Sequence, residues 1–131
     1  MPSTPLASGL VLLCIFATAL GCRSGAAPPA THPVRGIVRL DGQLLKGGVV
    51  EFRALAEPAW PTLGDIQPDG AFSLSIVHEG KRHPGALAGE YRVTVLFKGE
   101  GEKKPPPPIT LTKTYKVVEG DNTLTLDVMS P

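Results

Sequence analysis

Cysteine, tryptophan and charge are all scarce in this sequence. Of its 131 residues, two are cysteine, one is tryptophan and 19% are charged. Cys14 and Cys22 both lie close to the N-terminus, so a disulfide scaffold is not expected. The 13 Lys and Arg nearly balance the 12 Asp and Glu, for a formal net charge of +1, and no basic run exceeds two residues. The sequence therefore predicts no nucleic-acid-binding surface.

Glycine and proline are abundant instead, with 15 and 14 residues. Both residues disfavour helix interiors, so their density excludes a helical bundle. Hydrophobic residues make up 42% of the chain and the mean hydropathy is +0.08. This composition is too apolar for a wholly disordered chain and leaves room for one modest core. One small domain is predicted.

Residues 1–21 are predicted to be a targeting segment. They contain no charged side chain, and from Leu10 to Leu20 they read LVLLCIFATAL. Eleven apolar residues are too few for a spanning helix, which needs about 20. A short buried helix is the alternative, but the run has no polar face to turn toward water. Its length and small final residues are typical of a signal peptide.

Ala19-Leu20-Gly21-Cys22 resembles the lipobox of bacterial lipoproteins. In that family a diacylglyceryl group is added to the cysteine thiol, and the chain is then cleaved ahead of the cysteine. The resemblance implies that Cys22 is lipidated and anchors the protein to a membrane, facing the periplasm or the exterior. Ala19 stands where the family usually has Leu. Ordinary signal cleavage, after Gly21 or Ala27, therefore remains the alternative and would release a soluble protein.

Residues 22–33 are predicted to be a flexible tether. After Cys22 the chain reads RSGAAPPATHP, which is small, Pro-rich and free of any apolar period. Fully extended, these eleven residues would span roughly 35 Å at about 3.1 Å per residue. Such a segment would hold a domain away from a surface.

Residues 34–131 are predicted to form an all-β domain, a small antiparallel sandwich of about seven strands. Apolar and polar residues alternate through most of the region, so each strand has one face for a core and one for solvent. The clearest alternation lies in the stretches 34–40, 50–54, 72–76, 91–98 and 123–128. Weaker strands are expected at Gly64 to Gln67 and at Thr112 to Val118. No stretch of ten residues shows helical spacing.

Turn signals separate these strands. Asp41-Gly42 and Pro68-Asp69-Gly70 supply residues that tolerate positive φ or that preset a turn. The four prolines from Pro105 to Pro108 cannot donate hydrogen bonds to a neighbouring strand. They are predicted to form a polyproline-II connection or an edge, and not a central strand.

The order of four segments resembles the carboxypeptidase regulatory-like domain, a transthyretin-like sandwich, and especially its short versions among planctomycete lipoproteins. The segments are VRGIVRLDGQLLKGGVVEF, DIQPDGAFSLSI, PGALAGEYRVTVLF and KVVEGDNTLTLDV, within Val34 to Val128. The resemblance implies a non-catalytic module that stabilises or orients a partner. Between Glu100 and Thr112 this chain has KKPPPPITL, where family members usually carry a Tyr and an Asp-Pro.

The sequence predicts neither a catalytic site nor a cofactor or metal site. None of the three histidines, His32, His78 and His83, has a glutamate three residues later, as a zinc carboxypeptidase requires. Asp65-x-Gln67-x-Asp69-Gly70 loosely matches a calcium loop, but its twelfth position lacks the bidentate Glu. No Gly-x-Ser-x-Gly nucleophile motif occurs. Asn122 forms no glycosylation sequon, because Leu124 follows Thr123.

Trp60 is the candidate contact residue. It lies between prolines in the stretch EPAWPTLG, where an indole would either anchor a protein or glycan partner or cap one end of the sandwich. The sequence thus favours a non-catalytic, lipid-anchored envelope protein with a binding or structural role. The alternatives are a secreted accessory domain that acts beside a hydrolase, and a cryptic hydrolase or metal protein.

Overall fold

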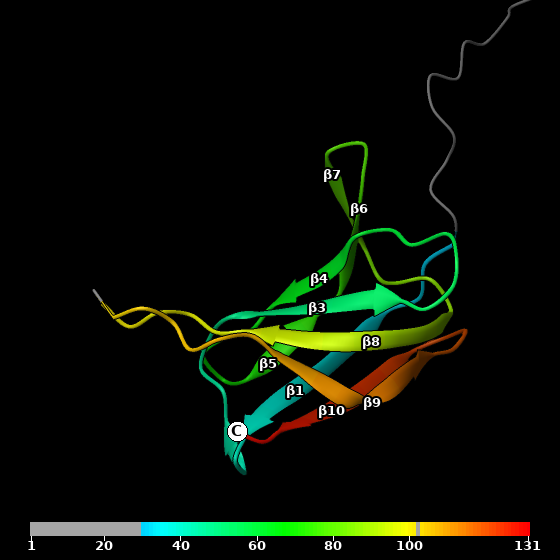
Figure 1. Ribbon diagram of the computed structural model, residues 1–131. Helices are drawn as coiled ribbons and strands as arrows, with labels where there is room; N and C mark the ends of the chain where they lie inside the picture. The colour runs from blue at the N-terminus through cyan, green and yellow to red at the C-terminus, as the bar shows by residue number, and fades with distance from the viewer. Residues whose placement is uncertain (1–29, 102) are drawn as a thin grey trace, which may run out of the picture.

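The described part of the chain is an all-β sandwich. A computed structural model describes residues 30–101 and 103–131, and this part contains no helix (Figure 1). The predicted fold class is therefore confirmed. Residues 1–21 and Cys22 lie outside the described residues. The strands are β1 Val34–Leu40, β2 Gln43–Leu44, β3 Val49–Ala54, β4 Thr62–Asp65, β5 Ala71–Ser73, β6 Ser75–His78, β7 Lys81–Pro84, β8 Gly89–Leu96, β9 Ile109–Val117 and β10 Asn122–Val128.

The strands form two sheets. Six of them follow the order β7-β6-β4-β3-β8-β9, and all of the pairs in this sheet are antiparallel. The second sheet has the order β10-β1-β2, and β5 also pairs with β1. Figure 1 shows β1, β5 and β10 lying across the back of the six-stranded sheet.

Two features differ from the uniform seven-stranded antiparallel sandwich expected from the sequence. The described residues form ten strands, several of them very short. In addition, β1 and β10 are parallel along their whole length, from Val34 beside Asn122 to Leu40 beside Val128. A parallel pair joins segments that are distant in sequence, so no local turn signal announces it.

One predicted strand is split between the two sheets. The stretch from Phe72 to Ile76 alternates as a single strand would, but β5 pairs with β1 whereas β6 pairs with β4. Leu74 lies at the crossing point, where its backbone N–H donates to the carbonyl of Val34 at 2.9 Å. Its side chain is buried in the core. The chain therefore passes from one layer to the other without a loop.

The core lies between the sheets and is built from the alternating apolar residues. Phe52 of β3 is at its centre, with ring centroids 6.2 Å from Phe72, 5.8 Å from Tyr91 and 6.5 Å from Tyr115. Tilted rings at these distances pack favourably. Aliphatic side chains complete the core, among them Val38, Val50, Val93, Val95, Leu126 and Val128.

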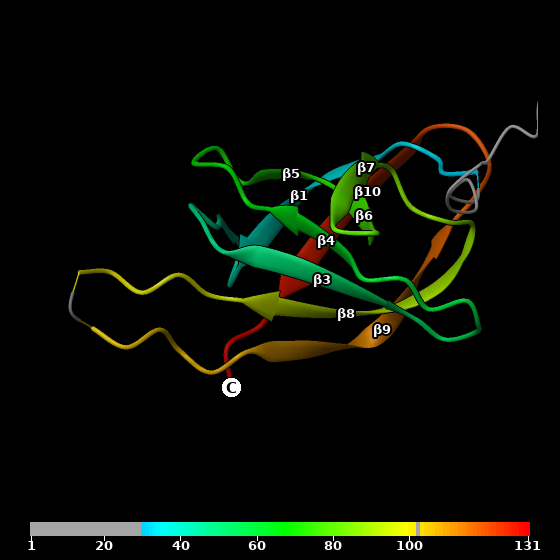
Figure 2. The same ribbon diagram turned by 90° about the horizontal axis from the view of Figure 1, so that it is seen from above.

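The turns follow the sequence signals. Asp41 and Gly42 both have positive φ, 50° and 84°, as a type I′ hairpin turn between β1 and β2 requires. Gly70 likewise has a φ of 83°. The prolines from Pro105 to Pro108 lie outside all strands, as predicted. The connection from β8 to β9 forms two arms, residues 97–101 and 103–108, which run side by side away from the sandwich (Figures 1 and 2). The four prolines lie in the second arm, which leads into β9.

Tyr91 links the core to the segment that precedes β8. Its hydroxyl donates a hydrogen bond of 2.6 Å to the carbonyl of Leu87, four residues upstream, in the manner of a tyrosine corner. Burial raises the pKa of Tyr91 above its ordinary value of 10.0, against the lowering effect of that hydrogen bond. Burial, followed by the negative charge of Asp127, also raises the pKa of Tyr115.

These raised pKa values predict a loss of stability in alkali. A tyrosine whose pKa is higher in the folded than in the unfolded state stabilises the fold below pH 10.0, and this contribution is lost as the pH rises through the folded pKa. Urea denaturation between pH 8 and 11 should show the free energy of unfolding falling above about pH 10. The Tyr91→Phe, Tyr115→Phe double variant should show a shallower fall. An equally steep fall in that variant would contradict the assignment, because the variant keeps every lysine.

Among the described residues there is no helix of the length and apolarity needed to cross a membrane.

Candidate functional site

Trp60 lies in the loop between β3 and β4, beside the turn end of the β6–β7 hairpin. The indole is half-buried and packs against His78 of β6, with ring centroids 4.2 Å apart and an interplanar angle of 56°. Its Nε1 is buried and has no hydrogen-bond partner within the described part of the chain. Such a donor is costly to bury unless it meets an acceptor. Part of the ring could meet a partner, and the rest is covered by the hairpin.

The region of His78 and His83 is a hairpin formed by β6 and β7. His78 ends β6 and His83 lies in β7, and both side chains are half-buried. Their ring centroids are 6.0 Å apart. The period of two in these strands places both rings on the face that also carries Ile76, opposite Val77 and Arg82. On that face His78 packs against Trp60 at a tilted angle, and His83 lies next to His78.

The residues that resemble a calcium loop are occupied by other contacts. Asp65 pairs with Arg82 across β4 and β7, with an Oδ2 to Nη1 distance of 3.1 Å. Asp69 accepts a hydrogen bond of 3.0 Å from the N–H of Ala71, which closes the turn before β5. Within the described residues no group of three or more His, Cys, Asp or Glu side chains is placed to hold a metal ion.

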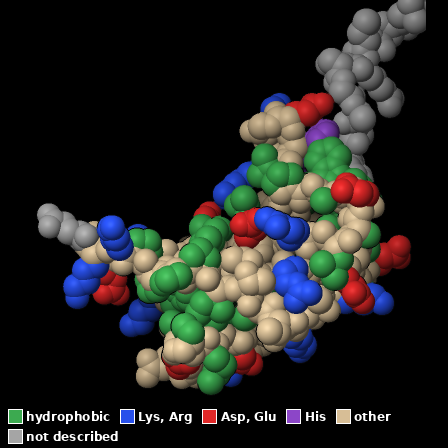
Figure 3. All heavy atoms as spheres, in the orientation of Figure 1, with side chains coloured by type: hydrophobic (Ala, Val, Ile, Leu, Met, Phe, Trp, Pro, Cys, Tyr) green, Lys and Arg blue, Asp and Glu red, His purple; other side chains and the backbone are tan. Residues whose placement is uncertain are grey.

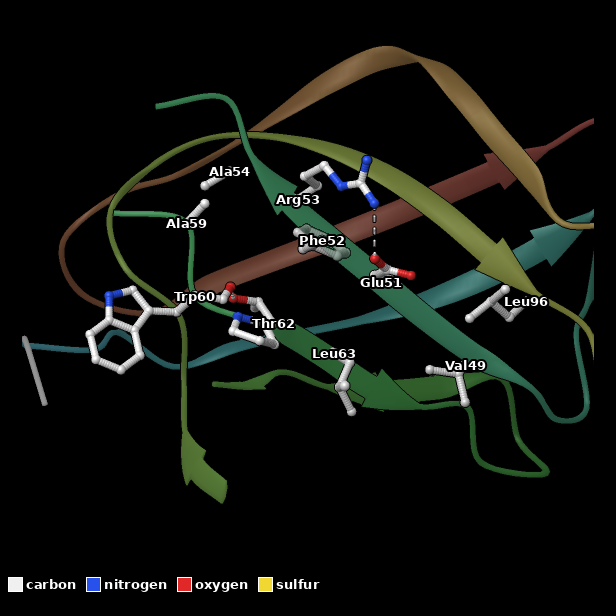
Figure 4. Close-up of a pocket in the computed structure, with 11 residues that line it drawn as sticks. Val49, Glu51, Phe52, Arg53, Ala54, Ala59, Trp60, Thr62, Leu63 and Leu96 are labelled. Carbon is white, nitrogen blue, oxygen red and sulfur yellow. Dashed lines mark hydrogen bonds and ion pairs between the residues drawn. The ribbon is translucent and has the colours of Figure 1, made fainter. Parts of the chain in front are cut away.

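A groove of about 330 Å³ lies on the outer face of the six-stranded sheet. Val49 and Leu63 lie on neighbouring strands, and Leu96 is the register partner of Val49 on β8. Glu51 and Arg53 line the next part of the groove and form an exposed ion pair at 3.7 Å. Figure 4 shows the indole of Trp60 turned away from these side chains. Trp60 nevertheless lines one end of the groove, with its ring directed outward toward the β6–β7 hairpin.

A larger cleft of about 630 Å³ lies at one end of the sandwich, between the β2–β3 connection and the arms that follow β8. Its floor is apolar, and its rim carries four lysines and one described acidic residue, Glu100. We call it the lysine cleft and define it by its floor residues Leu40, Leu45 and Phe97 and its rim residues Lys46, Lys98, Lys103 and Lys104. Figure 3 shows Lys and Arg side chains gathered around the loop at this end.

The lysine cleft and the N-terminal connection lie at opposite ends of the sandwich. His32 forms a β-bridge with Ala86, shortly before β8 begins at Gly89. The cleft lies beyond Leu96, where β8 ends. Eight strand residues separate these ends by about 23 Å, at roughly 3.3 Å per residue step. Figure 1 agrees, because the chain joins the sandwich at the right and the arms extend to the left.

Asn122 is a key residue whose role the sequence did not reveal. It is buried, and its Nδ2 donates to the carbonyls of Val118 at 2.9 Å, Gly120 at 3.0 Å and Pro33 at 3.2 Å. Its Oδ1 accepts from the N–H of Val118 at 2.9 Å. The side chain thus joins the β9–β10 turn to the start of β1. The turn motif Gly120-Asp121-Asn122 was the available signal, but it did not show which of its residues is buried.

Comparison with known proteins adds no assignment, since no family model, curated protein or solved structure matches this chain.

Proposed function

We propose that this protein is a lipid-anchored, non-catalytic module of a bacterial cell envelope, related to the carboxypeptidase regulatory-like domains. Lipid on Cys22 would hold it at the membrane, facing the periplasm or the exterior. The sandwich would bind a protein or glycan partner or serve a structural role. The all-β sandwich agrees with the fold that the sequence resemblance implies.

The observation that carries the proposal is the arrangement of the two ends. The N-terminal connection joins the sandwich at one end, and the lysine cleft is at the other. A domain anchored through its N-terminal segment would therefore present that cleft away from the membrane.

The end of the expected tether is attached to the sandwich. The hydroxyl of Thr31 donates to the carbonyl of Pro84 at 2.9 Å, and His32 pairs with Ala86. Arg23 to Ala30 is then the segment available as a spacer. Its eight residues would reach about 25 Å when extended.

Metabolic labelling with a palmitate analogue tests the anchor. We expect the wild-type protein to take up the label and Cys22→Ala to lose it completely, because the thiol is the site of lipid attachment. Cys14→Ala is the matched control and should keep the label, because Cys14 belongs to the predicted signal segment. Gel fluorescence of the purified protein measures uptake. An unlabelled wild type, or a Cys22→Ala variant labelled to the same extent, would rule out the lipoprotein assignment.

The labelling, together with membrane fractionation and co-purification, distinguishes the lipoprotein from the alternative function. A secreted accessory domain would be unlabelled, would leave the membrane fraction without detergent and would co-purify with a hydrolase. The motivating observation for this alternative is Ala19, which departs from the usual lipobox.

A further inference from the structure

The lysine cleft combines an apolar floor with a cationic rim. Leu40, Leu45 and Phe97 are half-buried side chains that pack against the core, and each leaves part of its surface facing the cleft. Covering that surface with a hydrocarbon chain would remove it from water, which is favourable. The floor therefore accepts an apolar group.

The rim specifies the charge of the ligand. Lys46 and Lys98 come from two segments that lie side by side, the β2–β3 connection and the residues just after β8, and both are exposed. Neither of the two ion pairs found within the described residues includes a lysine. Ammonium groups on the rim are thus available to an anionic ligand, and their hydrogen bonds to such a group are stronger than those to a neutral one.

We propose that the lysine cleft binds a single-chain anionic amphiphile, with its hydrocarbon chain on the floor and its anionic head among the lysines. The volume of about 630 Å³ lies in the range of sites for small ligands. The floor side chains are half-buried and line a cleft, which suits one chain better than a bilayer surface. This inference deepens the proposed binding role by naming a ligand class, and it does not depend on lipid at Cys22.

Isothermal titration calorimetry on the full-length Cys22→Ala protein provides the test. We expect decanoate to bind, and decyltrimethylammonium, which has the same chain length but a cationic head, to bind at least about tenfold more weakly. Butyrate shares the head with decanoate but lacks the long chain, and it should bind at least about tenfold more weakly as well. Equal binding of decanoate and decyltrimethylammonium would overturn the proposal.

Charge reversal locates the site. The Lys46→Glu, Lys98→Glu double variant should bind decanoate about tenfold more weakly. The matched control is Lys81→Glu, Lys116→Glu, which changes the same charge at exposed positions on β7 and β9 outside the cleft. The control should bind like the parent protein, and urea denaturation should show all three proteins folded. An equal loss in the control would show a general effect of net charge and would overturn the site.

Vesicles distinguish a lipid surface from a single amphiphile. If phosphatidylglycerol vesicles bind through Lys46 and Lys98 while decanoate does not bind, the partner is a membrane and the proposal is wrong. A negative result in the calorimetry or in the vesicle experiment would leave palmitate labelling at Cys22 unaffected. The amphiphile proposal and the lipid-anchor proposal can therefore fail separately.

Discussion

Asn122→Asp is expected to lower the free energy of unfolding by about 3 kcal/mol. The two side chains have almost the same shape, so the change leaves no cavity. The carboxylate has no N–H groups to offer the carbonyls of Pro33, Val118 and Gly120, which now accept from Nδ2. It would instead place a negative charge against three carbonyl oxygens in a buried site.

Urea denaturation at pH 7 measures this effect, and two further variants interpret it. Asn122→Ala also removes the acceptor for the N–H of Val118 and should cost a similar amount. Asp121→Asn changes the charge at the neighbouring exposed position and should alter stability by less than about 0.5 kcal/mol. If Asn122→Asp were as stable as Asp121→Asn, the side-chain network would not hold the turn.

Gly36→Ala is expected to destabilise the fold by about 3 kcal/mol. Replacing a strand glycine by alanine commonly stabilises a protein by about 0.4–1 kcal/mol, because the unfolded chain loses freedom. At this position a Cβ would lie 2.1 Å from the carbonyl oxygen of Leu124 and 2.8 Å from the ring of Phe72. The nearest obstacle is backbone of the parallel partner strand, so side-chain rotation cannot relieve the contact.

This prediction is tested by whether Gly36→Ala lowers or raises the free energy of unfolding. A midpoint in urea at or above the wild-type value would contradict the close packing of β1 on β10. Arg35→Ala, on the exposed face of the same strand, should change stability by less than about 0.5 kcal/mol. Adding Phe72→Leu to Gly36→Ala should not restore stability, since it removes only the ring and leaves the carbonyl of Leu124 in place.

Much of the local structure could be predicted from the sequence. The period of two assigned buried faces correctly in β1, β3 and β8, with Val38, Phe52 and Val93 all buried. Asp41-Gly42 formed the expected turn. These features depend on near neighbours in the chain, since a strand alternates and a turn closes through residues only a few positions apart.

The candidate sites could be predicted from the sequence less well than the local structure, because their residues are brought together only by the fold. Trp60 was identifiable as unusual, but its packing on His78 joins two segments that are 18 residues apart. The lysine cleft brings Lys46 beside Lys98, and neither belongs to a basic run longer than two. No local pattern announces either arrangement.

The sequence by itself determined the all-β class, the positions of most strands and turns, and the expectation of a lipid anchor at Cys22. The tertiary structure decided that the stretch around Leu74 divides between two sheets, that β1 runs parallel to β10, and that Asn122 is buried. The physical reason is that hydrogen bonds between strands are chemically alike along the backbone. Which strands pair is therefore settled by packing of the whole core, and alternation within any one strand does not encode it.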